Sequence, residues 1–353
     1  MVKYNVVSWL ARAFEMGASD MHLVVGLPPS IRLDGDIEFL PQEPLEGDLL
    51  RAALVDLITA DQKEKLQLKR DLEFSMSVPS LGRFRVSFYH ACDRLEACFR
   101  LIPTRISSFE ELGLPEAVEE LSSTSSGLVL ITGATGQGKT TTMNAIVDRI
   151  NSERRARIVT IEDPIEYLHS NKRSVVIQRE VETDAESFSS ALTAALRQDP
   201  NVICVGELRT LEAMATALTA SETGHLVLAT LHTSSAPGAV ERLVDAFPSH
   251  QQNQVRVQLA SSLRGVICQQ LLPRMAASGR VLACEVLLAN PGVRSLIRSG
   301  RSDHLRNVIM TGVNEGMMSM DQSLRKLYET GQISYEVALQ RAQSTECVRR
   351  QAV

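Results

Sequence analysis

The residues with the clearest capacity for chemistry lie between Gly133 and Thr140, where the chain reads Gly-Ala-Thr-Gly-Gln-Gly-Lys-Thr. This is a complete G-x-x-x-x-G-K-[ST] phosphate loop, whose glycines allow backbone N–H groups to face a polyphosphate. Lys139 can reach the β- and γ-phosphates, and the Thr140 hydroxyl can bind Mg²⁺. The motif predicts a nucleotide site made of the following residues: Gly133, Ala134, Thr135, Gly136, Gln137, Gly138, Lys139, Thr140 and Thr141.

The flanking sequence is the one that this motif requires. Residues 128–131 are all apolar, which is typical of a buried strand, and apolar residues recur at helical spacing over 143–150. Strand, glycine loop and helix together place the phosphates at a helix N-terminus. A glycine turn that merely precedes a helix is the weaker alternative, because eight residues match the motif in this context.

Carboxylates follow the next two apolar runs. Glu162, Asp163 and Glu166 lie close together after the first run, and Glu207 follows the run 202–205. Ligands of open α/β sheets bind at the carboxyl ends of strands, where these side chains fall. Transfer of a phosphoryl group to water needs a group that orients the water, and we predict that Glu207 is this base. The alternatives are a solvated acidic turn for the first group and a helix-capping glutamate for the second.

Two histidines, His225 and His232, bracket a third apolar run at 226–231. A lone histidine is usually structural, but two beside the predicted base indicate a sensor of the γ-phosphate. Metal ligation is the weaker alternative, because no further cluster of histidines and cysteines accompanies them.

The pattern along the chain divides it into two regions. Residues 1–105 are predicted to form a small α+β domain and residues 106–121 a linker. Residues 122–353 are predicted to form a second domain, in which strands alternate with helices from residue 127 to about 230, and this alternation predicts a mostly parallel sheet with helices on both faces. The chain after about residue 250 is expected to be mainly helical, with a helical C-terminal part over about 285–353.

The first region supplies cationic candidates on a hairpin predicted from residues 82–89 and 97–102. Arg85 and Arg100 face each other only if the register of the two strands allows it. The default interpretation is that these arginines are solvated side chains on the strands. The four candidates are Arg83, Arg85, Arg94 and Arg100.

Composition excludes several functional classes. A chain of 353 residues exceeds what one core usually organises, so two domains are expected. The net charge of −5 and the 4% aromatic content give no support for nucleic-acid binding. None of the six cysteines forms a C-x-x-C pair, so a zinc site is unsupported and reduced thiols suit a cytoplasmic protein. No signal peptide or membrane-length apolar run is present, so we expect peripheral membrane association only.

Together these motifs resemble the type II/type IV secretion ATPase superfamily, and most closely its type IV pilus twitching-motility retraction ATPases (PilT-type). The resemblance covers essentially the whole chain. Besides the phosphate loop, the segments that carry it are the following: 18–23 (Ala-Ser-Asp-Met-His-Leu), 82–86, Phe99-Arg100, 160–166, 206–209, 223–233, 258–263, 271–274, 320–324 and 331–335.

The resemblance implies a PAS-like first domain, a RecA-like P-loop NTPase domain and a ring of six subunits. It implies that ATP binds between the two domains, with Arg85 and Arg100 reaching the phosphates. Glu207 corresponds to the catalytic glutamate, Glu162 to an acidic-box carboxylate, and His232 to a histidine-box residue.

The implied activity is ATP hydrolysis, with Mg²⁺ held by Thr140, Asp163 and Glu207, partly through water. The homohexamer would be cytoplasmic and peripheral at the inner membrane, without insertion into it. It would turn or displace a membrane-embedded pilus platform protein, so that pilins leave the fibre during retraction. Chain length and scattered cysteines favour retraction over assembly, because assembly ATPases resemble a longer chain with a tetracysteine element.

Departures from the family pattern leave alternatives open. Asn201 and Thr210 stand where aspartates are usual, and the segment 292–299 lacks a final glutamate. Loss of two negative charges near the site predicts weaker hydrolysis. The alternatives are an accessory retraction ATPase working with a paralogue, a paralogue in another secretion system, and a nucleotide-gated scaffold with weak hydrolysis. A small-molecule kinase fits poorly, because Glu207 is placed to orient water.

Overall fold

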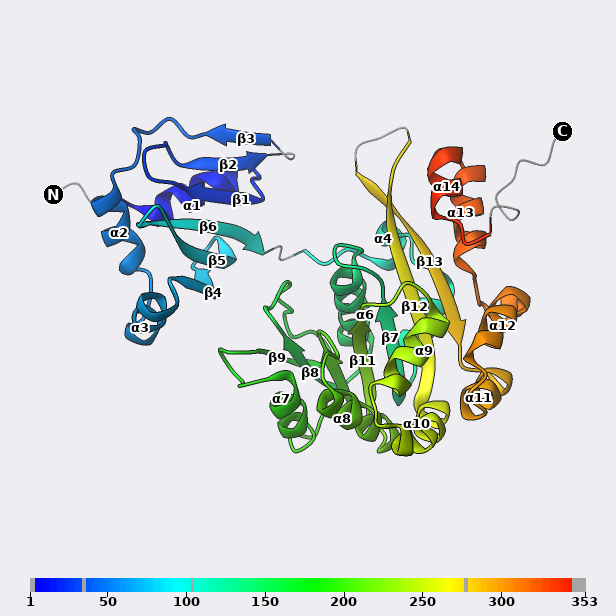
Figure 1. Ribbon diagram of the computed structural model, residues 1–353. Helices are drawn as coiled ribbons and strands as arrows, with labels where there is room; N and C mark the ends of the chain where they lie inside the picture. The colour runs from blue at the N-terminus through cyan, green and yellow to red at the C-terminus, as the bar shows by residue number, and fades with distance from the viewer. Residues whose placement is uncertain (1–3, 34–35, 103–104, 276–278, 345–353) are drawn as a thin grey trace. The chain divides into compact units, whose positions relative to one another are not determined.

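The computed structural model describes residues 4–33, 36–102, 105–275 and 279–344, and Figure 1 shows their helices and strands. The chain divides into two compact units. Unit 1 comprises Met1–Arg105 together with Pro164–Leu168, and unit 2 comprises Ile106–Asp163 together with His169–Val353.

Unit 1 is a six-stranded antiparallel sheet with three helices. Its strand order is β3-β2-β1-β6-β5-β4. Alternation along β5 buries Phe84, Val86 and Phe88 in the core and turns Arg85 to the opposite face. The elements are α1 (Val6–Glu15), β1 (Asp20–Leu23), β2 (Ser30–Leu33), β3 (Asp36–Phe39), α2 (Gly47–Val55), α3 (Ala60–Lys69), β4 (Asp71–Val78), β5 (Gly82–Ala91) and β6 (Arg94–Ile102).

The predicted hairpin of unit 1 is confirmed, and its register places Arg85 directly opposite Arg100. Between residues 47 and 69 the chain forms two helices and not one, because Thr59 starts α3 with a capping box to Gln62. Strands β3 and β4 were not predicted from the sequence pattern.

Unit 2 is built on a seven-stranded sheet of order β13-β12-β7-β11-β10-β8-β9, in which only β13 runs antiparallel to its neighbour. The predicted mostly parallel sheet is therefore confirmed. Its strands are β7 (Gly127–Thr132), β8 (Arg157–Glu162), β9 (Val175–Glu180), β10 (Val202–Val205), β11 (Leu226–Leu231), β12 (Leu263–Pro273) and β13 (Arg280–Leu288).

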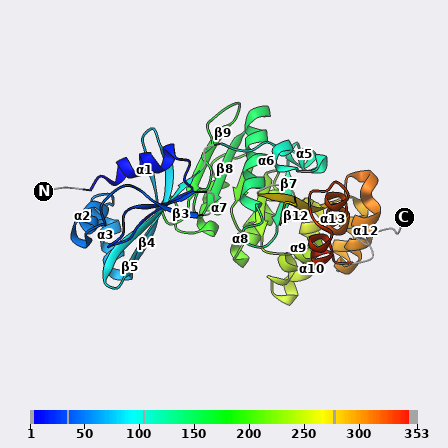
Figure 2. The same cartoon turned by 90° about the horizontal axis from the view of Figure 1, so that it is seen from above.

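Helices cover both faces of this sheet, as Figure 2 shows. One face carries α4 (Phe109–Leu112), α5 (Glu116–Ser122) and α6 (Lys139–Glu153). The other carries α7 (Phe188–Ala195), α8 (Leu211–Glu222), α9 (Ala236–Asp245) and α10 (Ser249–Ser262). Four short helices follow β13: α11 (Pro291–Arg298), α12 (Leu305–Thr311), α13 (Met320–Glu329) and α14 (Tyr335–Arg341). Within the described ranges, no helix is both long and apolar enough to span a membrane.

The expectation of a mainly helical chain after residue 250 is wrong for residues 263–273 and 280–288, which form β12 and β13. Most residues of both strands are buried on both faces, so the polar–apolar alternation that identifies a strand is missing. Strand β9 was also not predicted. Residues 106–121 include α4 and most of α5, and their buried side chains join the core of unit 2.

Candidate nucleotide site

The phosphate loop connects the carboxyl end of β7 to the start of α6. Gly133, Gly136 and Gly138 have φ angles of 145°, 76° and 80°, a region that side chains other than glycine rarely adopt. A Cβ atom at Gly136 would meet nothing within 4 Å, whereas one at Gly133 would lie 2.7 Å from the carbonyl oxygen of Gln269. The curled backbone is therefore open at Gly136 and closely packed at Gly133, as a cradle for phosphates requires.

Lys139, the first residue of α6, leads into a chain of polar contacts. Its Nζ atom donates to the carbonyl oxygens of Gly133 (2.8 Å) and Ala134 (3.0 Å), and lies 3.3 Å from Nδ1 of His232. The His232 Nε2 atom lies 3.2 Å from Oε1 of Glu207. The structure thus brings together three residues that the sequence analysis had placed at different strand ends.

These contacts assign the roles of the two ring nitrogens of His232. The Lys139 ammonium group can only donate, so Nδ1 of His232 accepts its hydrogen bond. The ring proton is then on Nε2, which donates to the Glu207 carboxylate. His232 therefore orients one oxygen of Glu207 and leaves the other to its second partner, Arg209.

Arg209 Nη2 contacts Glu207 Oε2 at 2.8 Å. Partial burial by itself would raise the pKa of Glu207, but the hydrogen bonds from Arg209 and His232 outweigh burial and hold this pKa below its ordinary value. Glu207 is consequently a carboxylate at neutral pH. Asp163, at the exposed end of the acidic box, adds a further negative charge that acts on Arg209.

Glu162 ends β8 and is only 3% exposed. Its Oε1 atom accepts hydrogen bonds from Thr160 Oγ1 at 2.6 Å and from Gln178 Nε2 at 3.1 Å. Gln178 lies on the adjacent strand β9, in register with Thr160. Two hydrogen-bond donors therefore hold this buried carboxylate in one orientation.

The same network continues to the phosphate loop. Gln178 Oε1 accepts from the backbone N–H of His169 (2.8 Å), His169 Nε2 contacts Asn144 Oδ1 (2.6 Å), and Asn144 Nδ2 donates to the carbonyl oxygen of Thr140 (2.9 Å). Burial lowers the pKa of His169 to about 4, so the ring is neutral and carries its proton on Nε2. The chain of bonds links the first turn of α6 to Glu162.

The sequence analysis missed the three connecting residues of this network. His169 follows the acidic box by a few residues, and Asn144 lies four residues after Thr140 on the same helix face. These spacings were the only signals available. Gln178 lies on a strand that the pattern did not predict.

The β12–β13 hairpin also contacts the phosphate loop. Gln137 Oε1 accepts from the backbone N–H of Leu271, and Arg280 Nη1 donates to the carbonyl oxygen of Gly136 at 3.0 Å. Further along α6, Thr142 Oγ1 accepts from Gln269 Nε2 at 2.7 Å. Residues more than 120 positions away in sequence therefore brace the loop from one side.

Arg85 and Arg100 belong to unit 1, and each is paired with a carboxylate. Arg85 Nη2 lies 2.9 Å from Glu73 Oε2, and Arg100 Nε lies 2.8 Å from Asp20 Oδ1. Burial alone would raise the pKa of Asp20, but hydrogen bonds from Arg100 and Ser19 outweigh burial and bring this pKa below its ordinary value. Asp20 therefore stays charged. Within unit 1 the two arginines and the segment 164–167 line a cavity of about 190 Å³.

The structure shows where Asn201 and Thr210 lie, the two residues expected to remove negative charge near the site. Asn201 precedes β10 and accepts from the backbone N–H of Arg157 (2.8 Å), at the amino end of the sheet. Glu207 follows the carboxyl end of the same strand, so the missing aspartate at Asn201 does not remove a charge beside it. Thr210 accepts from the N–H of Ala213 (3.2 Å) and caps α8, as an aspartate also would.

The two histidines do not act as a pair. His225 lies just before β11, at the amino end of the strand, and its Nδ1 atom contacts the carbonyl oxygen of Ala220 at 3.0 Å. His232 follows the carboxyl end of β11, beside Glu207. The γ-phosphate sensor predicted from the pair can therefore involve only His232.

Comparisons with known proteins agree with the motifs. A family model described as "Type II/IV secretion system protein" matches residues 5–352. The chain is 42% identical over 342 residues to the type IV pilus retraction ATPase PilT of Pseudomonas aeruginosa, covering 97% of this chain and 99% of that protein. It is 39% identical over 345 residues to a twitching motility protein of Neisseria gonorrhoeae, covering 98% and 92%.

A solved structure is similar over the same extent. The crystal structure of the pilus retraction motor PilT with bound ADP matches with a TM-score of 0.91 and 41% identity, over 98% of each chain. The resemblance inferred from the sequence motifs is confirmed by these matches, and so is a mixed α/β fold.

Proposed function

The chain belongs to the family of type II/IV secretion system proteins, and this membership supports ATP hydrolase activity. We propose that the chain uses ATP hydrolysis to drive type IV pilus retraction. The observation that carries the proposal is the contact chain from Lys139 through His232 to Glu207 beside the phosphate loop. This arrangement joins a phosphate-binding cation to a carboxylate that can orient water.

In the proposed mechanism, the backbone N–H groups of the loop and the N-terminus of α6 bind the phosphates of ATP. Lys139 neutralises the β- and γ-phosphates, and His232 holds Glu207 so that one carboxylate oxygen can accept a hydrogen bond from the attacking water. Mg²⁺, when bound, would neutralise phosphate charge, with Thr140 in direct contact and Asp163 and Glu207 acting partly through water.

Thr140, Asp163 and Glu207 carry side-chain oxygens, the ligand type that Mg²⁺ prefers. Among the described residues, no group of three or more histidine, cysteine, aspartate or glutamate side chains is placed to hold a metal. Mg²⁺ at nucleotide sites takes few protein ligands and completes its shell with phosphate oxygens and water. The ion is therefore expected to arrive with the nucleotide and not to occupy a preformed protein cage.

The acidic box has a supporting role in the proposal. Glu162 is buried and hydrogen-bonded to two donors, so it is suited to holding local structure and charge while Glu207 acts on the water. The link from Glu162 to Thr140 through His169 and Asn144 would couple the acidic box to the residue that binds Mg²⁺.

Arg85 and Arg100 are proposed to stabilise the charge of the transition state. Like charges directly opposite in a sheet are destabilising, and here Glu73 and Asp20 offset that cost. Substituting either arginine by alanine should lower kcat more than ATP affinity. Weaker binding with unchanged turnover at saturating ATP would contradict this role.

We propose a PAS-like domain over 1–105 and a RecA-like domain over 122–353, with the linker residues 106–121 folded as helices against the RecA-like domain. Six subunits would form a cytoplasmic ring, peripheral at the inner membrane through a pilus platform protein. One alternative is accessory action beside a paralogous ATPase, and another is a scaffold with weak hydrolysis. Measurements of ATP turnover by the isolated ring distinguish a motor from a scaffold.

Retraction can be tested in cells that carry this chain. We expect its deletion to leave pili assembled but unable to retract, as seen by fluorescence imaging of labelled fibres. The intact gene should restore retraction, and a Lys139→Ala gene should not. Normal retraction in the deletion strain would refute the proposed function, and rescue by Lys139→Ala would refute the nucleotide site.

A further inference from the structure

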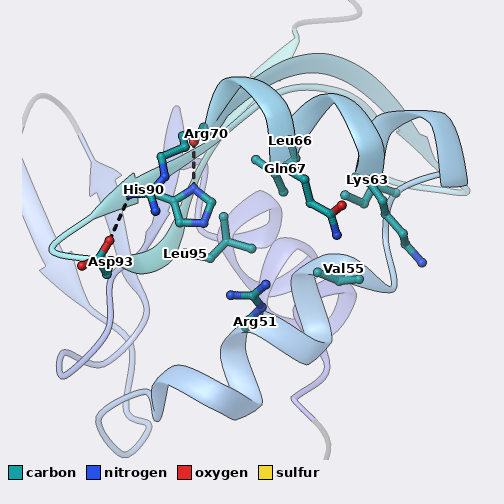
Figure 3. Close-up of a pocket in the computed structure, with 10 residues that line it drawn as sticks. Arg51, Val55, Lys63, Leu66, Gln67, Arg70, His90, Asp93 and Leu95 are labelled. Atoms are coloured by element: carbon teal, nitrogen blue, oxygen red, sulfur yellow. Dashed lines mark hydrogen bonds and ion pairs between the residues drawn. The ribbon is translucent and has the colours of Figure 1, made fainter.

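Unit 1 contains a second cavity, formed by α2, α3 and the turn between β5 and β6. Its volume is about 370 Å³, within the range of small-molecule sites. Four apolar side chains supply one part of its lining: Val55, Ile58, Leu66 and Leu95. Figure 3 shows polar side chains from all three elements around them.

The polar part of the lining is cationic. Arg51, Lys63 and Arg70 oppose the single carboxylate of Asp93, which gives a formal charge of +2 with His90 counted as neutral. The whole chain carries −5, so this cavity departs in sign from the rest of the molecule. A concave surface with concentrated positive charge favours anions.

The rim of the cavity is fixed in an uncommon conformation. Arg70, Cys92 and Asp93 have φ angles of 63°, 48° and 60°, in the left-handed region that residues other than glycine seldom adopt. Arg70 Nη1 lies 3.0 Å from Asp93 Oδ1, and the Arg70 carbonyl oxygen accepts from His90 Nδ1 at 2.8 Å. Arg70 is the C-cap of α3, and Cys92 and Asp93 form the two-residue turn between β5 and β6, so these backbone angles fix the rim as part of the fold.

Arg51 supplies the group that an anion would contact. Figure 3 shows its side chain extending from α2 into the cavity, whereas Lys63 extends outward along the rim. Across the described ranges, neither the Arg51 guanidinium nor the Lys63 ammonium has an acceptor within hydrogen-bond distance. A guanidinium beside an apolar lining can gain a strong charge-assisted bond from a phosphate or carboxylate.

We propose that this cavity binds a small organic anion in which a phosphate or carboxylate group is joined to a short apolar body. Arg51 binds the anionic group, and the apolar lining covers the body. The lining contains no phenylalanine, tyrosine or tryptophan, and its one aromatic ring, the His90 imidazole, is hydrogen-bonded to the Arg70 carbonyl oxygen, so a stacked nucleobase is not the ligand class that we propose. The inference goes beyond the proposed ATPase, because the cavity belongs to unit 1 and the phosphate loop to unit 2.

The test uses isothermal titration calorimetry of the full chain with octyl phosphate below its micelle concentration. Inorganic phosphate has the anionic group without the apolar chain, and octanol has the apolar chain without the anionic group, so each should bind far more weakly than octyl phosphate. Arg51→Gln should weaken octyl phosphate binding by about tenfold or more, and Arg51→Lys should retain part of the affinity. Lys65→Gln is the matched control, since Lys65 lies on α3 outside the cavity and pairs with Asp61 at 3.3 Å.

Failure of octyl phosphate to bind, or equal affinity in Arg51→Gln and Lys65→Gln, would overturn the proposal. A sedimentation experiment with phosphatidylglycerol vesicles identifies the source of the anion. Sedimentation that Arg51→Gln abolishes would assign the site to a membrane lipid. Octyl phosphate binding without sedimentation would assign it to a free anion. Neither measurement depends on ATP hydrolysis, so this inference and the proposed function fail separately.

Discussion

The Glu207–Arg209 pair gives a prediction about pH that can be worked through from the structure. Arg209 and His232 together hold the pKa of Glu207 below its ordinary value, against the opposing effect of burial. Replacing Arg209 with glutamine removes one of the two stabilising groups. The pKa of Glu207 should then rise, so that the carboxylate is protonated, and turnover lost, at a higher pH as the solution is acidified.

The size of the shift follows from exposure. The pair is 2.8 Å long, but the Arg209 side chain is 65% exposed and that of Glu207 18%. Solvent screening limits such a pair to about 0–1 kcal/mol. The pKa of Glu207 should therefore rise toward its ordinary value, and losing the pair should cost no more than about 1 kcal/mol. Turnover well above the pKa, at pH 8, should change little.

The assay is the pH profile of kcat/KM for ATP hydrolysis, measured for the native chain, Arg209→Gln and the control Arg325→Gln. Arg325 lies on α13 and makes a comparable exposed pair with Glu329 at 2.7 Å. Only Arg209→Gln should move the acid limb upward. The reasoning would be refuted by an unmoved acid limb combined with a more than tenfold loss of turnover at pH 8, because Arg209 would then act on the substrate and not through Glu207.

Three further predictions concern the supports of the site. Thr160→Val should lower the free energy of unfolding by about 1–3 kcal/mol, because the buried Glu162 side chain loses the hydrogen bond from Thr160 Oγ1; unchanged stability in urea unfolding would contradict this. Arg280→Gln should weaken ATP binding by calorimetry with kcat preserved, since it removes the brace on Gly136; unaltered affinity would show that the brace is dispensable. ADP with Mg²⁺ at 100 times its Kd should stabilise the native chain by about 2.7 kcal/mol but not Lys139→Ala, as read by thermal shift; equal shifts in both would remove Lys139 from the site.

The sequence was sufficient to predict the parts of the site that are contiguous or that end strands. The phosphate loop is one uninterrupted motif, so its residues could be named directly. Glu207 and His232 follow the carboxyl ends of β10 and β11, which are neighbours in the sheet. A parallel sheet brings such ends together, and the contact of 3.2 Å between the two side chains follows from this rule.

The supports of the site could not be predicted, because their partners are distant in sequence. Gln178 reaches Glu162 only through the pairing of β8 with β9, and Arg280 reaches Gly136 only through the β12–β13 hairpin. Strands β12 and β13 are largely buried and so lack the alternation that identifies a strand, whereas β9 is a short edge strand whose partly exposed residues do not alternate either. Asn201 was placed near the site by its closeness to Glu207 in sequence, but a strand separates them by about 13 Å of extended chain.

The central claim is that Glu207 enables hydrolysis of ATP within a ring of this chain. The most direct test measures steady-state ATP hydrolysis of the purified protein and of Glu207→Gln, with particle mass determined by light scattering in the same buffer. We expect a six-subunit particle that hydrolyses ATP, and a Glu207→Gln ring of equal mass that binds ATP but does not hydrolyse it. Equal turnover in the two proteins would contradict the account.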